Sequence, residues 1–418
     1  MKKFSLWILI LVLVLTVPAL SSCDKNSGKG SVGLVYTVNE DGKTCSVSEI
    51  GSCTDTDIVI PKKNPDGYRV TAIEEAAFLG CSNLTSITIP DSVTSIGAMA
   101  FSNCSGLTSI TIPKSVTNIN SSTFAGCSGL TRITVSKGNT AYHSQDNCLI
   151  DTQNKTLILG CKTSIIPADG SVTNIGRLAF NGCSGLTSVT IPDSVTSIGE
   201  RAFGDCNGLT RITVSNGNTV YHSQDNCLID TKNKVLVFGC KASIIPADGS
   251  VTNIGEMAFF SCSGLTSITI PDNVTSIGDW AFFLCSGLTS ITIPDSVTSI
   301  GGNAFSGCSG LTSVTLPDSV TSIGEYAFYE CSSLTSITIP NNVTSIGYAA
   351  FCACNGLTSV TIPNSVTSIG DGAFSFCRGL TSITFNGTKE QWNAIKKDNW
   401  NGSTGDYTIY CSDGDIAK

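Results

Sequence analysis

The chain repeats one 23-residue unit, which limits it to folds that can be built by repetition. The stretch CSGLTSITIPDSVTSIG, residues 285–301, returns with few changes along the chain. Cysteines spaced 23 residues apart mark the units in three series: Cys81, Cys104 and Cys127; Cys183 and Cys206; and Cys262, Cys285, Cys308, Cys331, Cys354 and Cys377. Although 418 residues would ordinarily suggest about two or three domains, this periodicity predicts one stacked array.

Within a unit, the alternation of side chains separates an inner face from an outer face. In LTSITI, residues 288–293, we expect Leu288, Ile291 and Ile293 to point inward. Ser290 and Thr292 then face outward, and the proline that follows ends the strand. The first half of each unit is therefore predicted to be a short strand with one apolar face.

The second half of the unit supplies further apolar positions and a turn. Val297 and Ile300 form a second inward pair, and Gly301 is expected to release the backbone into a tight turn. In GxxAFxxC, residues 278–285, Phe282 and Cys285 are three apart, so a single 3-10 turn brings both onto the core side. One unit cannot bury these residues alone, but neighbours stacked about 4.8 Å apart bury them all.

A period of this length with LxxLxL-like spacing is typical of a leucine-rich repeat. The predicted fold class is a mainly β repeat solenoid with short parallel strands and short 3-10 or helical turns. The step of 56 residues from Cys127 to Cys183, and again from Cys206 to Cys262, marks two insertions. Each insertion repeats the pattern NCLID, a turn, and TLILG or VLVFG, which predicts a β-hairpin.

Both ends of the repeat region have the features of caps. Asn39–Gly42 is a hairpin turn between VYTV and CSVSEI, so a hairpin is expected to cover the first coil. Thr388 and Gln391 match a capping box that starts a helix carrying Trp392 and Ile395 on one stripe. Caps are needed because terminal coils would otherwise expose open edges.

The N-terminus indicates export. MKKFSLWILILVLVLTVPALSSC has two lysines, an apolar run and small residues that end at Cys23. Leu20-Ser21-Ser22-Cys23 resembles the bacterial lipobox, which implies that Cys23 is the lipidation site and that residues 1–22 are removed. An ordinary cleaved signal and an uncleaved anchor helix are the alternatives. Residues 24–31 are rich in Lys, Gly, Ser and Asn, as in a flexible tether.

The predicted organisation has five parts. They are a lipoprotein signal peptide, 1–22; a tether, 23–32; an N-terminal hairpin cap with a first degenerate repeat, 33–80; the solenoid, 81–385, with hairpin insertions near 136–171 and 215–250; and a C-terminal cap, 386–418.

The chain resembles the BspA-like leucine-rich repeat proteins. The resemblance rests on LTSITIPDSVTSIGxxAFxxC, on the lead-in LVYTVNEDGKTCSV with TDIVIP and VTAIEEAAFLGC, and on the ending ITFNGTKEQWNAIKKDNW. It implies a surface-exposed binding protein of bacteria, with adhesion to host matrix proteins or other cells as the expected activity. Together with Cys23, it implies a lipid-anchored protein of the cell envelope that is exposed at the outer membrane. The repeat pattern does not by itself identify a ligand.

Composition and motifs argue against several functions. A net charge of −8 would not attract nucleic acid or anionic lipid surfaces. His143 and His222 stand at equivalent places in the two insertions, next to a serine and close to an aspartate. Neighbours in sequence seldom face one another, and no GxSxG elbow is present, so no catalytic residues are assigned and the protein is expected not to be an enzyme.

The cysteines are interpreted as structural. Stacked residues project side by side at the strand spacing, which does not suit disulfide geometry, so buried thiols are expected along the repeat column. A pair between Cys45 and Cys53 across the N-terminal cap stays open. Without a CxxC motif, no metal or other cofactor is expected; contact of His143 and Asp146 with a metal is a weaker alternative.

Aromatic residues enter the variable positions of GxxAFxxC in the later units, and stacking is expected to align them in a stripe. The candidate ligand-binding residues are Phe260, Trp280, Phe283, Tyr326, Tyr329, Tyr348 and Phe376. A contiguous exposed aromatic patch is typical of recognition sites. The alternative is that these rings only shield the buried phenylalanines from solvent.

The leading functional hypothesis is adhesion to an extracellular protein, such as a host matrix or cell-surface protein, through a solenoid face. The alternatives are binding of a glycan, by the aromatic stripe or by the repeated Ser/Thr face, and a passive surface coat. The simpler purpose of the Ser/Thr face is solubility combined with high β-propensity.

Overall fold

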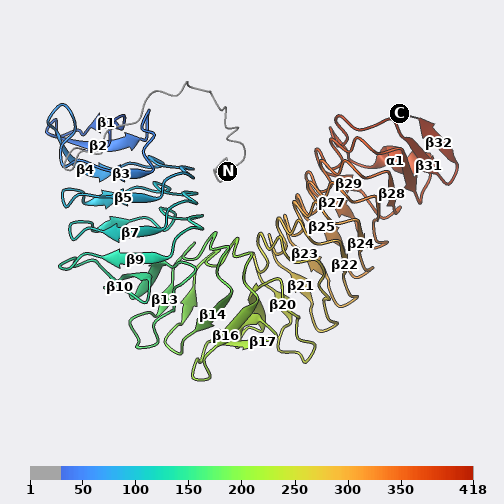
Figure 1. Cartoon of the computed structure of the whole chain (residues 1–418). Helices are drawn as coiled ribbons and strands as arrows, with labels where there is room; N and C mark the ends of the chain where they lie inside the picture. Colours follow the sequence, from blue (N-terminus) through green and yellow to red (C-terminus); the bar gives the residue numbers. More distant parts are fainter. Residues whose placement is uncertain (1–29, 418) are drawn as a thin grey trace.

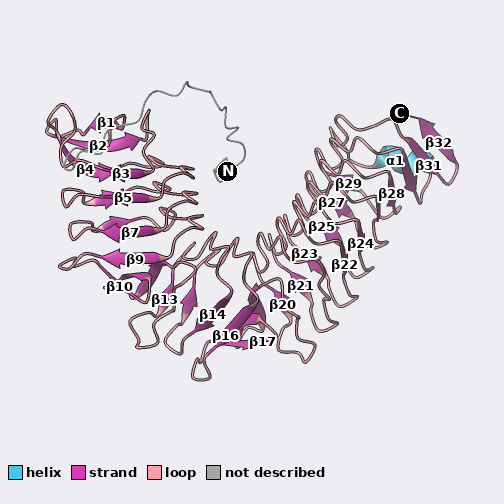
Figure 2. Ribbon diagram, viewed as in Figure 1, coloured by secondary structure: helices cyan, strands magenta, loops and turns pink. Residues whose placement is uncertain are grey.

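The structure is a computed structural model that describes residues 30–417. The predicted signal peptide and the lipidation site Cys23 lie outside the described residues. The described chain forms a curved, mainly β solenoid that runs as an arch from the N-terminal cap to the C-terminal cap (Figure 1). Short strands joined by loops and turns recur along the whole solenoid, and the one helix of the described residues lies near the C-terminal end (Figure 2). The predicted fold class is confirmed.

The LTSITI segment of the coils forms a first type of strand. These strands pair in parallel with the next coil, in the register of the repeat, so that Ile291 lies opposite Val314. The strands of the first type are β3 (Asp57–Val59), β5 (Ser86–Thr88), β7 (Ser109–Ile112), β9 (Arg132–Val135), β14 (Ser188–Ile191), β16 (Arg211–Val214), β22 (Ser290–Thr292), β24 (Ser313–Thr315), β26 (Ser336–Thr338), β28 (Ser359–Ile362) and β30 (Ser382–Phe385).

The VTSIG segment of the coils, and TLIL and VLVFG in the two insertions, form a second type of strand, most often of two residues. These strands also pair in parallel with their equivalents, as Ile277 does with Ile300. The strands of the second type are β4 (Arg69–Ile73), β6 (Ser95–Ile96), β8 (Asn118–Ile119), β12 (Thr156–Leu159), β13 (Asn174–Ile175), β15 (Ser197–Ile198), β19 (Val235–Gly239), β20 (Asn253–Ile254), β21 (Ser276–Ile277), β23 (Ser299–Ile300), β25 (Ser322–Ile323), β27 (Ser345–Ile346) and β29 (Ser368–Ile369).

The core consists of columns of identical side chains. Leu288, Ile291 and Ile293 are 0, 3 and 2% exposed, which confirms the predicted inward face. Phe282 stacks on Phe305 with ring centroids 5.2 Å apart. Leu288 belongs to the same hydrophobic cluster as its equivalents in the neighbouring coils, as stacking requires. Burying each such Phe contributes roughly 1.5–3 kcal/mol, so the column is a main source of stability.

Each insertion adds two strands before a strand of the second type. The added strands are β10 (Tyr142–Gln145) and β11 (Cys148–Asp151) in the first insertion and β17 (Tyr221–Gln224) and β18 (Cys227–Asp230) in the second. β11 pairs antiparallel with β12, and β18 pairs antiparallel with β19, which are the strand pairs expected from NCLID and its partner. The insertions also divide the core into three hydrophobic clusters. In Figure 1 they lie in the region where the arch bends.

Both ends of the solenoid are covered. At the N-terminal end, β1 (Val35–Val38) and β2 (Thr44–Glu49) form a hairpin, and β2 continues in parallel with β4. At the C-terminal end, α1 (Lys389–Ala394) begins with the predicted capping box of Thr388 and Gln391. β31 (Thr408–Cys411) then extends the sheet from β30, and β32 (Gly414–Ala417) pairs antiparallel with β31. Trp392 is 3% exposed and helps to cover the last coil.

The glycine of VTSIG has a different role from the one expected. Gly301 does not have a positive φ; instead, a Cβ at this position would lie 2.5 Å from the backbone N of Asp279 and 2.6 Å from the carbonyl carbon of Gly278. The expectation of a conformational role was therefore wrong for this residue. Glycine is needed because the backbone of the preceding coil approaches too closely for any side chain.

Candidate functional site

The eight residues GxxAFxxC form a compact turn, here termed the arc, and arcs of successive coils make one surface, the arc face. In the arc Gly278–Cys285, amide groups alternate between two kinds of partner. The N–H groups of Trp280, Phe282 and Leu284 donate to carbonyls of the next coil at 2.8–3.0 Å. The intervening N–H groups donate to the carbonyl three residues earlier in their own arc. Backbone hydrogen bonds thus join this arc directly to the next one.

Two variable positions of the arc have left-handed backbone conformations. Trp280, at the third position, has φ 59°, and Leu284, at the seventh, has φ 56°. Residues other than glycine rarely adopt this region, and bulky ones least of all. The conformation sets the direction in which the side chains at these two positions project, Trp280 among them. This geometry is not visible in a sequence pattern.

The repeat cysteine has a polar role in addition to filling space. The Sγ of Cys308 donates to the carbonyl O of Phe282 in the preceding coil at 3.1 Å, and the same oxygen accepts the N–H of Cys285. The same contact, at 3.1–3.2 Å, is made by Cys104, Cys127, Cys206, Cys285, Cys331, Cys354 and Cys377. Burial raises the pKa of Cys308 to about 12, so the sulfur stays protonated and able to donate.

Two cysteines of the insertions also belong to this column. The Sγ of Cys183 donates to the carbonyl O of Gly160 at 3.5 Å, so Gly160 and Cys161 take the places of a repeat Phe and Cys. Gly239 and Cys240 stand in the same places in the second insertion. In the N-terminal cap, Cys45 and Cys53 are both buried, 0 and 8% exposed.

The candidate aromatic residues fall into two clusters. In the first, here called the tryptophan cluster, Phe260 stacks on Phe283 with centroids 5.0 Å apart, and Trp280 meets Phe283 edge-on at 4.8 Å. The guanidinium of Arg201 lies 3.9 Å from the centroid of Phe260. Phe260 is only 6% exposed, so its ring supports the others, whereas Trp280 and Phe283 are half-buried.

The second group, here called the tyrosine cluster, lies two coils further along. Tyr326 contacts Tyr329 at 5.7 Å and Tyr348 at 5.1 Å between centroids, both edge-on. Burial, and then hydrogen bonding to Tyr348, raises the pKa of Tyr326 to about 12; burial and Glu330 do the same for Tyr329. These phenols therefore remain neutral hydrogen-bonding groups.

The predicted single stripe is thus two clusters separated by one coil that carries Asn303 and Ser306 at the corresponding positions. Phe376 occupies the seventh arc position, whereas the ring residues of the two clusters stand at the second, third and sixth; it is 47% exposed. Leu284, which the sequence reasoning did not single out, is 41% exposed beside the tryptophan cluster.

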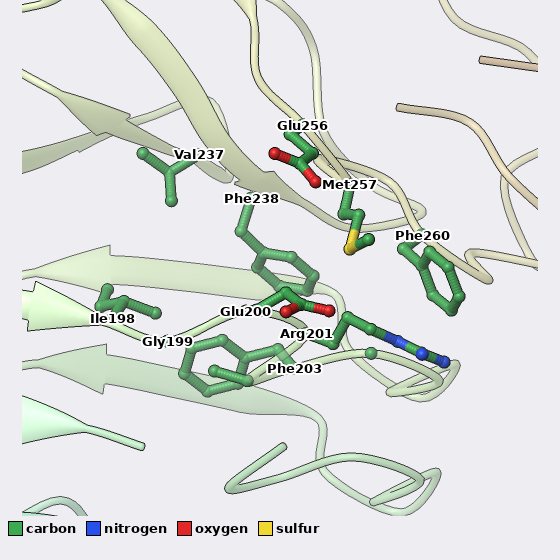
Figure 3. A pocket seen from close by; sticks show the side chains of 12 residues that line it. Ile198, Gly199, Glu200, Arg201, Phe203, Val237, Phe238, Glu256, Met257 and Phe260 are labelled. Atoms are coloured by element: carbon green, nitrogen blue, oxygen red, sulfur yellow. The ribbon is translucent and has the colours of Figure 1, made fainter. Parts of the chain in front are cut away.

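A cavity of about 190 Å³ adjoins the tryptophan cluster. It lies between the arcs 199–206 and 255–262, and its apolar lining includes Phe203, Phe238 and Met257. Figure 3 shows Glu200 and Glu256 on opposite sides of this space, with Arg201 extending away toward Phe260. The Nε of Arg201 is buried without a hydrogen-bond partner, and burial lowers the pKa of this guanidinium, opposed by Asp205 and Glu200.

The cavity exists because the inserted coil lacks most of its arc. Ile254 and Cys262 are eight positions apart, whereas Leu236 and Cys240 are four apart, so nothing fills the space between the flanking arcs. The sequence analysis did not find this cavity, although the short spacing between Leu236 and Cys240 could have indicated it. Across the gap, the flanking coils are joined by the N–H of Ser263, which donates to Oδ1 of Asn207 at 3.1 Å.

The first insertion has the same shortened coil, but its gap is closed. The N–H of Gly126 donates to the carbonyl O of Asn181 at 2.9 Å. A Cβ on Gly182 would lie 2.5 Å from Cα of Gly126, so the two backbones are in direct contact. This contact between the arcs 120–127 and 176–183 is here called the closed seam.

The histidines do not assemble with the neighbouring serines. Nδ1 of His143 lies 2.9 Å from Oγ1 of Thr152, while Oγ of Ser144 accepts the N–H of Val135 at 3.0 Å. The two side chains leave β10 in opposite directions, as alternation along a strand requires. The described residues contain no group of three or more His, Cys, Asp or Glu placed to hold a metal ion. Within residues 30–417, no helix has the length and apolarity that a membrane span requires.

Several solved structures are similar to this chain. A leucine rich cell surface protein from Faecalibacterium prausnitzii A2-165 is 27% identical, with 90% of this chain and 99% of that chain covered and a TM-score of 0.49. A leucine-rich repeat protein from Eubacterium ventriosum is 20% identical, with coverage of 92% and 98% and a TM-score of 0.53, and shares the fold. One from Bacteroides ovatus is 27% identical, with coverage of 90% and 98% and a TM-score of 0.31.

Comparison with curated protein sequences gives no match. The family described as BspA type leucine rich repeat region matches residues 51–169, 154–235, 236–321 and 281–397. These matches span most of the chain and follow the same 23-residue unit that builds the coils. The chain belongs to the BspA type leucine-rich repeat family.

Proposed function

We propose that this protein is a non-enzymatic recognition protein of a bacterial cell surface, which binds an extracellular protein through its arc face. Family membership supports an interaction or surface role. The observation that carries the proposal is the pair of partly exposed aromatic clusters on arcs that hydrogen bonds fix to one another. Rigid Trp and Tyr side chains lose little conformational entropy on binding and often dominate interface energetics.

The test compares aromatic positions with a matched polar position. Trp280→Ala combined with Tyr326→Ala is expected to weaken binding to the protein ligand by about tenfold to a hundredfold. Asn303→Ala is the control, because Asn303 occupies the same third arc position, with φ 56°, in the coil between the clusters. Binding to a panel of purified matrix proteins is measured by surface plasmon resonance. An unchanged affinity of the double variant would remove the arc face from the proposal.

A glycan ligand is the second candidate. Tyr348 leaves 44% of its surface exposed, and a phenol can both stack on a sugar ring and form a hydrogen bond. Testing the same variants on a glycan array separates the two candidates. Only one class of ligand should bind the wild type and lose that binding when the aromatic residues are replaced. A wild type that binds neither class would leave a passive surface coat.

The proposal includes a lipid anchor at Cys23, which would hold the protein at the outer membrane with the solenoid facing outward. It rests on the lipobox-like sequence that ends at Cys23. Two or three acyl chains give far stronger membrane attachment than one. Mass spectrometry of the mature N-terminus should find a diacylglyceryl cysteine, and Cys23→Ala should release the protein from the membrane fraction.

A further inference from the structure

The cavity beside the tryptophan cluster combines apolar side chains with three charged ones, Glu200, Arg201 and Glu256. Phe238 and Met257 are half-buried there. Leu159, the counterpart of Phe238 in the first insertion, is 6% exposed. Glu200 pairs with Arg177 at 3.4 Å. Glu256 is exposed and has no ion pair among residues 30–417. One carboxylate at the cavity is therefore available to an incoming cation.

The arc face beyond the cavity carries charge of one sign. The arcs from Gly255 to Cys377 contain five acidic residues and no Lys or Arg, namely Glu256, Asp279, Glu325, Glu330 and Asp371. The same arcs hold the tryptophan and tyrosine clusters. Aromatic faces attract cations through their quadrupole, and carboxylates attract them by charge. Both features favour the same kind of partner.

We propose that the partner of the arc face is a basic polypeptide segment and that the cavity receives one of its lysine side chains. In this arrangement, the lysine stem packs against Phe238 and Met257, and the ammonium group reaches Glu256. Further basic residues of the segment then lie along the aromatic clusters and the acidic arc positions. This inference rests on the proposed function and specifies the chemistry of the ligand.

The size of the cavity fits such an occupant. Apolar cavities of about 150 Å³ accept a group of roughly six heavy atoms such as benzene, and this cavity measures about 190 Å³. A lysine stem with its ammonium is close to that size. Long cationic side chains commonly bury the stem on apolar surface and leave the charged end at the rim. Arg201 does not occupy the space, because its guanidinium lies over Phe260.

The test uses the full chain in a non-ionic detergent and a labelled twelve-residue peptide of alternating lysine and serine. Fluorescence polarisation should show binding that weakens when ionic strength is raised. The same peptide with every lysine acetylated keeps its length but loses its charge, and it should bind at least about tenfold more weakly. Equal binding of the acetylated peptide would overturn the proposal of a cationic ligand.

Two substitutions address the cavity itself. Met257→Trp should fill the cavity and weaken binding of the lysine peptide by about tenfold. The φ of Met257, 57°, matches that of Trp280, so the backbone at this arc position can accept tryptophan. Glu256→Gln should weaken binding of the lysine peptide by about threefold. Glu256 is exposed, so this second variant tests the cavity even if Met257→Trp does not fold.

Matched controls exist for both. Asn303→Trp places the same bulk at the third arc position away from the cavity, and Glu75→Gln removes a carboxylate from the second arc position at the far end of the solenoid. Neither should reduce the affinity. If Met257→Trp and Glu256→Gln leave binding of the lysine peptide unchanged, the cavity does not hold lysine. If maltohexaose binds and is lost in Met257→Trp, the site belongs to a neutral glycan instead.

Failure of this inference is distinguishable from failure of the proposed function. If the extracellular protein ligand is lost in the Trp280 and Tyr326 double variant but is unaffected by Met257→Trp and by competing lysine peptide, the arc face binds protein without a lysine in the cavity. If neither set of substitutions changes binding of the protein ligand, the proposed function itself fails.

Discussion

The two insertions have nearly the same sequence, yet the first ends in a closed seam and the second in an open cavity. Both replace a full arc by a short link, and both add the same strands. They differ in the arcs on either side. The closed seam is made by Gly126 and Gly182, whereas the same arc positions beside the cavity hold Asp205 and Ser261. The neighbours therefore decide whether a missing arc leaves usable space.

The comparison also shows what the insertions share. In each, a glycine stands where a ring of the phenylalanine column would otherwise lie, and the next phenylalanine packs directly on it. Phe238 in the second insertion then covers the preceding ring, Phe203, at 5.2 Å between centroids. Leu159 stands at the same place in the first insertion and belongs to the same hydrophobic cluster as Phe124. The two insertions thus share their internal packing, and they differ from each other at the arc face.

The largest predicted effect tests the shared packing. A Cβ at Gly160 would overlap Cε1 of Phe180, and one at Gly239 would overlap Cε1 of Phe259. Gly160→Val and Gly239→Val should each lower the free energy of unfolding by about 3 kcal/mol or more. Urea denaturation followed by circular dichroism measures both. A loss at only one of the two sites would mean that the insertions do not share this packing.

A smaller effect should separate the insertions. Leu159 is 6% exposed, whereas Phe238 is half-buried at the cavity. Leu159→Ala should therefore cost about 2–3 kcal/mol of unfolding free energy, and Phe238→Ala about 1–2 kcal/mol in spite of its larger side chain. Chemical denaturation of the two variants under one set of conditions provides the measurement. The reverse order would indicate that the cavity is filled in solution.

An even smaller effect on the free energy of unfolding tests the closed seam. Gly182 has φ 75°, and a side chain there would press on Gly126, so Gly182→Ser should cost about 1 kcal/mol and open the seam. Hydrogen exchange of the Gly126 amide should become faster in this variant, because its bond to Asn181 is lost. The matched change Ser261→Gly, at the same position beside the cavity, should leave exchange in the first insertion unaltered. Unchanged protection of Gly126 after Gly182→Ser would contradict this account.

The smallest effect concerns pH and should be equal in both insertions. Hydrogen bonds from Ser171 and Gln145 lower the pKa of Asp169 to about 2, and those from Ser250 and Gln224 do the same for Asp248. A carboxyl whose folded pKa lies below its unfolded value of about 3.9 stabilises the fold above that pH and loses this contribution as the pH falls toward 2.

Side-chain amide resonances of Gln145 and Gln224 should therefore shift together between about pH 4 and pH 2. Asp169→Asn should abolish the shift of Gln145 and leave that of Gln224 in place. Titration midpoints near the ordinary aspartate value in either insertion would argue against these hydrogen bonds.

The coil architecture was accessible from sequence because each coil repeats its neighbour. Leu288, Ile291 and Phe282 are buried for the same reason as their equivalents in the other units. One assignment of inside and outside therefore served for all units. The helix cap at Thr388 was equally readable, since its hydrogen bonds are local. The role of Gly301 was not, because the clash that excludes a side chain comes from the backbone of another coil.

The candidate site was only partly accessible. The aromatic residues were visible as departures from the repeat, and so was the coil without them that carries Asn303 and Ser306. Which rings contact one another was not visible. The left-handed conformation of Trp280 and Tyr326 turns their side chains in a direction that no helical or strand period predicts. Arg201 escaped notice because its contact, Phe260, lies more than two repeat lengths away in sequence.

The sequence by itself determined the coil, the direction of every repeated apolar residue, the two extra hairpins and the caps. These features follow from local periodicity and from contacts between adjacent identical units. The sequence of one unit is therefore enough to predict them. Only the tertiary structure decided which rings remain exposed and which of two nearly identical insertions encloses a cavity. That outcome depends on the volume and backbone conformation of arcs brought together across an insertion, and packing at such a junction obeys no repeat.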